Sequence, residues 1–284
     1  MSNGILARQN EESSITRLAA QRQLYREAYR IEKFNLFFIV LPIFFSLIQD
    51  VVGWAKTASG LLALVVLFFL FLLDNWKKDK KILAATIQQE FDVYVFSMDW
   101  DCKLFGIRKN LNVEIAKASK NIMDNEIERE LLKNWYRIET DAMPLKDGIA
   151  ACQKENYSWD FYLRRRYRSF LIALLALFLA VPLGISSLNE ELINEFLFKI
   201  IIIFPILTWI IKTISGINSD LKRMETINSS VYSTNERTME DLMFTQKYIF
   251  ENRKFLIKIP DWFYYFFKDN DEDREKRALG IKSL

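Results

Sequence analysis

The sequence predicts a mainly α-helical membrane protein, with four transmembrane helices in two hairpins and a composite cytoplasmic α(+β) domain. Three observations predict this class. Four blocks of the chain are mostly apolar for about 20 residues, the length that crosses a bilayer as a helix. The blocks form two closely spaced pairs, and lysine and arginine gather on one side of each pair. A large buried helical core is the alternative explanation for such apolar blocks.

The composition of the 284 residues narrows the possible chemistry. Apolar residues make up 51% and charged residues 26%, which excludes a disordered or collagen-like chain. The sequence has no histidine, which excludes Ser-His and Cys-His catalysis and histidine metal sites. Cys102 and Cys152 are too few for a zinc site or a disulfide framework. Since no glycine-rich phosphate motif is present either, we expect a protein that is not an enzyme and has no metal or cofactor.

The first element, residues 1–33, is a charged segment that we expect to form a cytoplasmic amphipathic helix. Ile15, Leu18 and Tyr25 lie at helical spacing with basic residues between them, and the helix is expected to begin near Ser13 or Ser14. A cleavable signal peptide is not expected, because the first apolar block comes only after this charged segment.

The second element, residues 34–73, is the first predicted transmembrane hairpin. Its spans are 34–52 and 54–73, separated only by Gly53. Lysine and arginine lie just before the first span and just after the second, and basic residues beside a span stay on the cytoplasmic side. We therefore expect both chain termini and the middle of the chain in the cytoplasm.

The third element, residues 74–168, is the predicted cytoplasmic domain, and its first part carries the best strand signals of the chain. Asp74 to Gln89 should continue the second span as a helix. Phe91 to Trp100 is rich in aromatic and β-branched residues with near alternation, which predicts a strand. Leu104 to Ile107 predicts a second, shorter strand. The rest of this domain returns to helical periodicity, with a helix from Leu145 to Tyr167 that runs into the third span.

The remaining elements repeat the pattern of hairpin and cytoplasmic segment. Residues 169–211 form the second predicted transmembrane hairpin, with spans 169–188 and 192–211. Residues 212–284 are the predicted cytoplasmic C-terminal helical region. There, Ile217 to Phe255 predicts one long helix, and Pro260 ends it before an aromatic cluster.

Asp99 and Asp101 have the spacing of a two-metal site, since residues two apart on a strand share a face. No phosphate-binding loop precedes the pair. The alternative is that these carboxylates are solvated at a strand end or cap a helix, and we favour this interpretation.

Trp135 and Tyr136 are adjacent aromatic residues at the end of a predicted helix. Their flat rings are suited to stack on a base, as in proteins that bind single-stranded nucleotides. Ordinary packing of Trp and Tyr in a hydrophobic core is the alternative.

The predicted helix before the third span carries a continuous polar face. Gln153, Asn156, Asp160 and Arg164 recur at helical spacing, and Arg165 follows directly. Such a face can hydrogen-bond a base edge and hold phosphates through guanidinium groups. The alternative for the arginines is a basic collar at the lipid headgroups.

Five segments together resemble the SMODS-associating four-transmembrane effector family. They are ARQNEESSITRLAAQRQLYREA at residues 7–28, FDVYVFSMDW at 91–100, NWY at 134–136, CQKENYSWDFYLRRRY at 152–167 and IPDWFYYFF at 259–267. The order of these segments around two membrane hairpins carries the resemblance, which covers nearly the whole chain. The resemblance implies a membrane effector of CBASS-type bacterial anti-phage defence, which responds to a cyclic oligonucleotide from a cognate nucleotidyltransferase by damaging the membrane in abortive infection.

The residue patterns and the family resemblance together give the expected function. A cyclic di- or trinucleotide is the expected activating ligand, with Trp135 or Tyr136 as stacking platform and the polar helical face as reader. Residues 74–168 are then a sensor domain, and the multi-pass chain lies in the bacterial inner membrane. We expect the lipid bilayer and further copies of the chain as partners, in a homo-oligomer, and no DNA or RNA. The alternatives are a ligand-independent channel or transporter, and a membrane scaffold protein.

Overall fold

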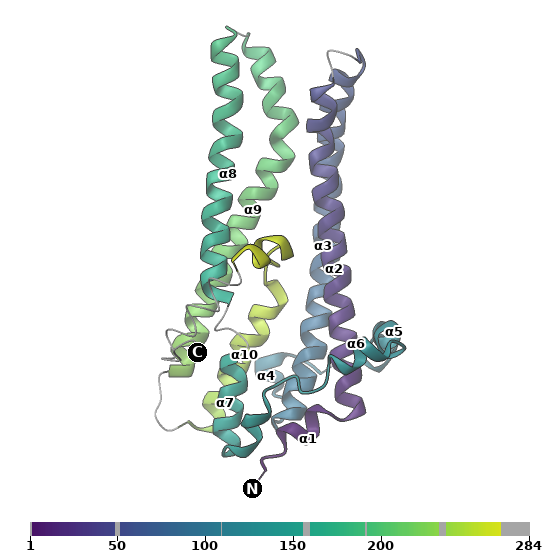
Figure 1. Ribbon diagram of the computed structural model, residues 1–284, viewed down its shortest axis with the longest axis vertical. Helices are drawn as coiled ribbons and strands as arrows, with labels where there is room; N and C mark the ends of the chain where they lie inside the picture. Colours follow the sequence, from purple (N-terminus) through teal and green to yellow (C-terminus); the bar gives the residue numbers. More distant parts are fainter. Residues whose placement is uncertain are drawn as a thin grey trace, which may run out of the picture.

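The computed structural model describes residues 2–48, 52–108, 110–155, 160–190, 192–232 and 237–267. Every regular element within these ranges is a helix (Figure 1). The elements are α1 (Ile5–Gln9), α2 (Glu12–Leu47), α3 (Ala55–Val95), α4 (Cys102–Phe105), α5 (Asn112–Met123), α6 (Glu126–Glu130), the 3-10 helix η1 (Ile138–Ala142), α7 (Leu145–Glu155), α8 (Asp160–Leu188), α9 (Ile193–Tyr232) and α10 (Met239–Phe255). Residues 261–267 are also helical.

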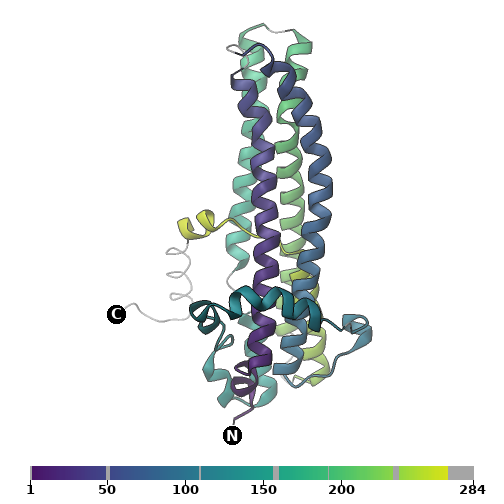
Figure 2. The same ribbon diagram turned by 90° about the vertical axis from the view of Figure 1, so that its right-hand side faces the viewer.

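Four long helices give the molecule its shape. Figures 1 and 2 show α2 beside α3 and α8 beside α9, as two hairpins whose turns lie at the same end of the molecule. The short helices and α10 gather toward the opposite end, where the N-terminus lies. The predicted arrangement of two helical hairpins with the other segments on one side is therefore present.

Three of the described helices are long and apolar enough to cross a membrane: Thr57–Val95, Phe161–Leu188 and Ile193–Ser229. α2 is not among them, because its described apolar part ends at Leu47 and residues 49–51 lie outside the described ranges. Aromatic and aliphatic side chains such as Phe37, Phe68 and Leu183 point outward from the long helices and are exposed. An apolar outer surface is what helices in contact with lipid need.

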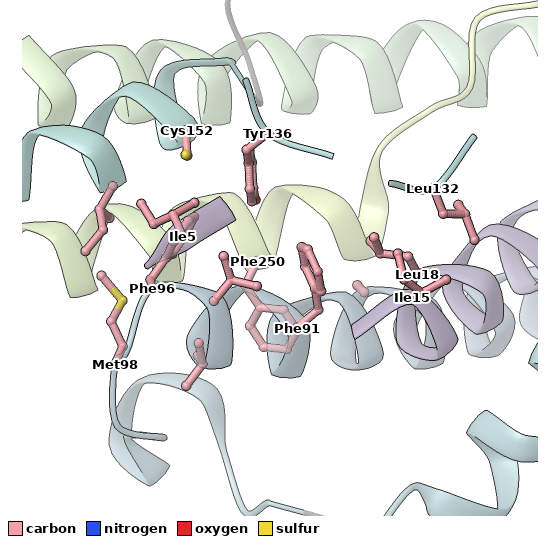
Figure 3. Packing of buried hydrophobic residues seen from close by; sticks show 14 of the residues in the cluster. Ile5, Ile15, Leu18, Phe91, Phe96, Met98, Leu132, Tyr136, Cys152 and Phe250 are labelled. Atoms are coloured by element: carbon pink, nitrogen blue, oxygen red, sulfur yellow. The ribbon is translucent and has the colours of Figure 1, made fainter. Parts of the chain in front are cut away.

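A separate hydrophobic core holds the end of the molecule opposite the hairpin turns. Figure 3 shows Ile5, Leu18, Phe91, Tyr136 and Phe250 packed together from α1, α2, α3, the segment before η1 and α10. The ring of Tyr136 stacks on that of Phe91 at a centroid distance of 6.2 Å and contacts Phe96 at 5.3 Å. Segments that are far apart in the sequence thus share one core, which makes this a composite domain.

The strand predicted at Phe91 to Trp100 is wrong: the chain is helical to Val95. A hydrogen-bonded helix end of the Schellman type follows, in which the amide of Met98 donates to the Val93 carbonyl at 2.9 Å and the amide of Ser97 to the Tyr94 carbonyl at 3.1 Å. Ser97 has a φ of 52°, the left-handed conformation that this motif needs. The aromatic and β-branched residues of this stretch are core-packing residues of α3, and tertiary packing overrides their β propensity.

The second predicted strand, Leu104 to Ile107, is also wrong, because Cys102–Phe105 forms the short helix α4. Asp101 caps that helix, with its carboxylate accepting hydrogen bonds from the amides of Lys103 and Leu104. The capping interpretation of Asp101 is therefore confirmed. Among the described residues there is no strand, so the α(+β) prediction for the cytoplasmic domain reduces to α.

The long helix predicted from Ile217 to Phe255 is two helices. α9 ends at Tyr232 and α10 begins at Met239, and residues 233–236 between them lie outside the described ranges. Thr238 starts α10 with a capping box, in which its hydroxyl accepts from the Asp241 amide and the Asp241 carboxylate accepts from the Thr238 amide. The helix predicted from Leu145 to Tyr167 is likewise described as two, α7 and α8, on either side of residues 156–159, which lie outside the described part of the chain.

Candidate functional site

Asp92 on α3 is the centre of a buried polar network. Its side chain is fully buried and accepts a hydrogen bond from the Tyr136 hydroxyl at 2.6 Å on one carboxylate oxygen. The other oxygen accepts from Gln246 Nε2 at 2.8 Å and forms an ion pair with Arg253. Tyr136 comes from the segment before η1, whereas Gln246 and Arg253 both come from α10. One carboxylate thus ties three parts of the composite domain together.

The network continues from Gln246 to two further glutamines. Gln246 Nε2 also donates to Gln89 Oε1 at 3.0 Å, and Gln153 Nε2 of α7 donates to Gln246 Oε1 at 3.1 Å and to the Leu242 carbonyl at 2.8 Å. We refer to Gln89, Asp92, Tyr136, Gln153, Gln246 and Arg253 as the Asp92 network, and all six side chains are buried. Gln89 and Asp92 are one helical turn apart on α3, and Gln246 and Arg253 two turns apart on α10, so both helices present their polar groups on one face.

Not every polar atom in and beside the network is satisfied. Gln89 Nε2, Gln153 Oε1 and the Tyr25 hydroxyl on α2 are buried without a hydrogen-bond partner among the described residues. Burial raises the pKa of the Tyr25 phenol. Burial by itself lowers the pKa of Arg253, but the Asp92 carboxylate together with Tyr136 and Tyr25 more than offsets this effect and raises it, so the guanidinium keeps its charge. A buried polar group without a partner costs about 1–3 kcal/mol. Other arrangements of these side chains are therefore closer in free energy to the present one than they would be if every group were bonded.

A second buried cluster lies where α10 meets the long helices. Arg164 on α8 donates to the Asp220 carboxylate of α9 at 2.7 Å and to the Ile257 carbonyl at 2.8 Å, while the Ile257 amide donates to Asp220 at 2.8 Å. Lys81 on α3 donates to the Leu256 carbonyl at 2.9 Å. We refer to Lys81, Arg164, Asp220 and the backbone of residues 256–257 as the junction cluster. Three long helices therefore hold the two residues that directly follow α10.

The N-terminal segment fixes the position of the aromatic pair. Gln9 accepts a hydrogen bond from the Tyr136 amide at 2.8 Å and donates to the Tyr136 carbonyl at 3.2 Å. Asn10 bonds both the amide and the side chain of Asn134, which has a φ of 52°. These side-chain bonds fix the backbone at Trp135 and Tyr136, which lie outside any regular helix.

The structure distributes the sequence-predicted site residues over two places. Tyr136 and Gln153 belong to the Asp92 network, and Trp135 packs at the edge of the hydrophobic core, half-buried. Arg164 belongs to the junction cluster, whereas Arg165 is exposed on α8, beside the ring of Phe161.

For two of the predicted ligand-binding residues, the structure does not describe the side chain. Asn156 lies outside the described residues, and of Asp160 only the backbone is described. The predicted polar helical face is therefore not seen as one surface, and its role in ligand binding stays a prediction.

Sequence reasoning missed the acidic residues that organise both clusters. Asp92 stands between Phe91 and Val93 in what reads as a strand, and Asp220 stands in a long helix without an obvious partner. For Asp92, a single carboxylate within an apolar stretch is the signal that was present, because a buried charge needs a paired cation. The partners Arg164 and Arg253 are 56 and 161 residues away along the chain, so the sequence gives no local sign of either pair.

The described residues contain no group of three or more acidic or cysteine side chains that could hold a metal ion. The clusters instead offer hydrogen-bond donors, acceptors and a buried arginine. Such groups can recognise a polar ligand or relay a rearrangement between helices.

Comparison with known proteins gives one family and one relative. The model of the SMODS-associating 4TM effector domain matches residues 3–280. The chain is similar to a probable CBASS effector molecule of Bacillus cereus (strain VD146), with 23% identity over 293 residues that cover 95% of each chain. No solved structure matches the chain.

Proposed function

Because the chain belongs to the SMODS-associating four-transmembrane effector family, a family of CBASS effectors, we propose that it binds a cyclic di- or trinucleotide at its composite cytoplasmic domain and then permeabilises the inner membrane. The ligand comes from a cognate nucleotidyltransferase of the same defence system. The protein acts as a non-enzymatic effector, and cell death by membrane damage limits the spread of the phage.

One observation carries this proposal: α10 joins the two buried clusters. Gln246 and Arg253 of α10 lie in the Asp92 network, and the two residues after its last residue, Phe255, are held by the junction cluster. A displacement of α10 that breaks its contacts at one cluster therefore reaches α3, α8 and α9 at the other. This is the physical path by which an event in the cytoplasmic domain changes the packing of membrane helices.

The incomplete Asp92 network is the proposed switch element. A ligand favours only a conformation that it binds more tightly than the resting one. The nucleotide supplies donors and acceptors to Gln153 and Tyr136, and their present partners are released. Because Gln89 and Gln153 each have an unsatisfied atom in the resting arrangement, this exchange costs less than breaking a fully bonded network.

The accessible side chains are the proposed first ligand contacts, because Gln153 and Tyr136 are buried in the resting arrangement. Trp135 is half-buried beside the network and offers its ring for stacking on a base, and Arg165 is exposed and offers its guanidinium to a phosphate. Asn156 and Asp160, which lie between Trp135 and Arg165 in the sequence, remain proposed contacts to the nucleotide. Arg164 acts through the junction cluster and is a positioning residue in this scheme.

The proposal is tested with the full-length chain reconstituted in dye-filled liposomes. A panel of cyclic di- and trinucleotides is added, with the matching linear nucleotides as controls. We expect dye release with at least one cyclic compound and none with its linear form. Release that needs no nucleotide would support the ligand-independent channel instead, and no release with any compound would count against the effector function.

The role of α10 is tested with a double variant that removes both charges of the central pair, Asp92→Asn with Arg253→Met. Replacing both partners avoids an uncompensated buried charge, so the protein is expected to fold. With nucleotide bound, we expect dye release from liposomes that contain the double variant to be at least tenfold slower than from liposomes that contain the original chain. Lys247→Met is the matched control, since it also removes a cation from α10 but none from the network. Equal release by the double variant and the control would remove the Asp92 network from the mechanism.

A further inference from the structure

A cavity of about 220 Å³ lies between the cytoplasmic halves of α3 and α9, next to the end of α10. Glu32 of α2 and residues from the three helices line it. The lining residues are Glu32, Leu70, Asp74, Lys77, Lys78, Lys81, Thr208, Trp209, Lys212, Thr213, Lys254, Phe255 and Ile257. None of the residues assigned to ligand binding above lines this cavity.

The charge of the lining is strongly positive. The five cations are Lys77, Lys78, Lys81, Lys212 and Lys254. Asp74 accepts from Lys77 at 3.1 Å and from Lys212 at 3.2 Å, so two lysines share one carboxylate, while Lys254 bonds to Glu251 at 2.7 Å. With Glu32 included, the lysines outnumber the carboxylates five to three, and an anion is the ligand that such a cavity takes.

The cavity crosses the predicted membrane boundary. Leu70 and Trp209 lie inside the predicted spans, which end at residues 73 and 211, and the lysines of α3 begin one turn beyond. Tryptophan is typical of the headgroup level, where its amphipathic ring lies half in lipid and half in water. Lys77, Lys78 and Lys81 fall within little more than one helical turn, and Lys212 faces them from α9 through the shared Asp74.

We propose that this cavity binds the phosphate headgroup of an anionic phospholipid from the cytoplasmic leaflet. Basic pockets between transmembrane helices on the cytoplasmic side take such headgroups. The cavity volume is below the roughly 300–1,000 Å³ of sites that enclose a drug-sized ligand, so it admits a headgroup phosphate rather than a whole cyclic dinucleotide. Its apolar upper wall at Leu70 and Trp209 faces the level at which the acyl chains begin.

The site has a structural consequence at the junction cluster. Lys81 lines the cavity and also donates to the Leu256 carbonyl, and Phe255 and Ile257 line it from the end of α10. A headgroup in this position contacts both the membrane helices and the helix end that they hold. Occupation by lipid therefore stabilises the attachment of α10 to α3 and α9. Lipid binding itself does not depend on the proposed nucleotide response.

The test measures lipid retained by the full-length chain. The protein is purified from vesicles of phosphatidylcholine with phosphatidylglycerol, and the lipid that stays bound is quantified by native mass spectrometry. We expect enrichment of phosphatidylglycerol, and a loss of about fivefold for each cavity lysine removed. Lys78→Gln and Lys212→Gln are the test variants, and Lys222→Gln on α9 is the control because it removes an exposed lysine that does not line the cavity.

Lys78→Gln keeps the test valid if Lys212→Gln disturbs folding, since Lys78 contacts the Phe255 ring and is not one of the two lysines that share Asp74. Equal enrichment in both cavity variants and in Lys222→Gln would overturn the proposal. Soluble competitors identify the source of the phosphate: inorganic phosphate and cyclic dinucleotides should leave phosphatidylglycerol bound. Displacement by the cyclic dinucleotide, with its binding lost in Lys78→Gln, would assign the cavity to the nucleotide and overturn the lipid site. Loss of lipid enrichment together with intact nucleotide-triggered release would leave the proposed function standing.

Discussion

Arg164 of α8 forms a buried ion pair with Asp220 of α9. It is 2% exposed, and its partner Asp220 is completely buried. Removing one member of a buried ion pair destabilises proteins by about 3–5 kcal/mol when the remaining charge is left uncompensated. Asp220 also pairs with Arg223, so this value is the upper limit for the loss of Arg164. An arginine at the end of a membrane span can serve as a headgroup collar, a ligand contact or a buried pair, and only its distant partner decides among these.

We therefore expect Arg164→Ala to lower stability in detergent, by at most about 3–5 kcal/mol because Arg223 still compensates Asp220, and Arg165→Ala to change it by less than about 1 kcal/mol. Arg165 is the matched control because it is the next residue on the same helix and is exposed. The double variant Arg164→Met with Asp220→Leu should recover most of the loss. Equal stability of the two single variants, measured by thermal unfolding, would contradict the buried pair.

The two cysteines differ in a way that labelling can measure. Cys152 is fully buried, and burial raises the pKa of its thiol to about 12. At neutral pH it is therefore almost entirely protonated, and the protonated thiol does not attack a maleimide. Cys102 is exposed at the start of α4.

We expect one maleimide per folded chain, on Cys102, and two after denaturation, counted by mass spectrometry. Cys102→Ser should remove the label from the folded protein. In whole cells, a membrane-impermeant maleimide should reach Cys102 only after lysis, because the domain that carries it is expected in the cytoplasm. Labelling in intact cells would reverse the orientation, and fast labelling of Cys152 would contradict the buried core around it.

At the scale of elements, the helical hairpins could be predicted from the sequence, and the details of the composite domain opposite the hairpin turns could not. A span requires only length and apolarity, and both are local properties. Phe91 to Val95 alternates like a strand, but its side chains fill a core shared with α1, α2 and α10, which lie far away in sequence. Its helix ends at Val95 and is closed by Ser97, a non-glycine residue with positive φ, which gives no sequence signal.

The candidate site was predictable only in part for the same reason. Tyr136 and Gln153 stood out as aromatic and polar residues, and both lie in the Asp92 network. Their partners are Asp92, Gln246 and Arg253. These residues come from stretches whose sequence is typical of a strand or an ordinary helix, so nothing there indicates a polar network. A buried network depends on which helices meet, and the separation of 154 residues between Gln246 and Asp92 cannot be bridged from one sequence.

The aromatic helix at residues 261–267 is an element whose two faces differ. Phe263 is buried and packs on Tyr167 at 4.9 Å and on Phe170 at 5.6 Å, at the start of the predicted span in α8. Trp262 and Phe266, in contrast, are 60% and 76% exposed. Figure 2 shows this helix projecting sideways from the long helices. Exposed aromatic residues at the headgroup level anchor a segment in the membrane interface.

We therefore expect lipids brominated near the headgroup to quench part of the tryptophan fluorescence of the reconstituted chain, and Trp262→Phe to remove much of that quenching. Trp135→Phe is the control, because Trp135 packs at the edge of the hydrophobic core that lies opposite the hairpin turns. Both variants remove one tryptophan, so only its position differs. The same quenching in Trp262→Phe as in the original chain would place this helix away from the membrane.

At the scale of the whole molecule, one copy cannot account for a large lesion. Four helices packed around one axis fill the space between them with side chains, so a single chain encloses no wide channel. The outer faces of the long helices are apolar and would face lipid or further copies of the chain. Self-association in the membrane is the simplest way to turn a rearrangement of α8 and α9 into permeability.

Dye release should therefore depend on protein density more steeply than in direct proportion. We expect the initial rate, at saturating cyclic nucleotide, to rise with at least the second power of the protein-to-lipid ratio, because several copies must meet before the bilayer opens. Nucleotide affinity per chain, measured on the same vesicles, should stay constant if binding precedes assembly. A rate proportional to protein density would show that one copy, or an assembly formed before ligand addition, is sufficient. Crosslinking of the same vesicles with and without nucleotide separates these two cases, because only a preformed assembly gives crosslinked oligomers before the ligand is added.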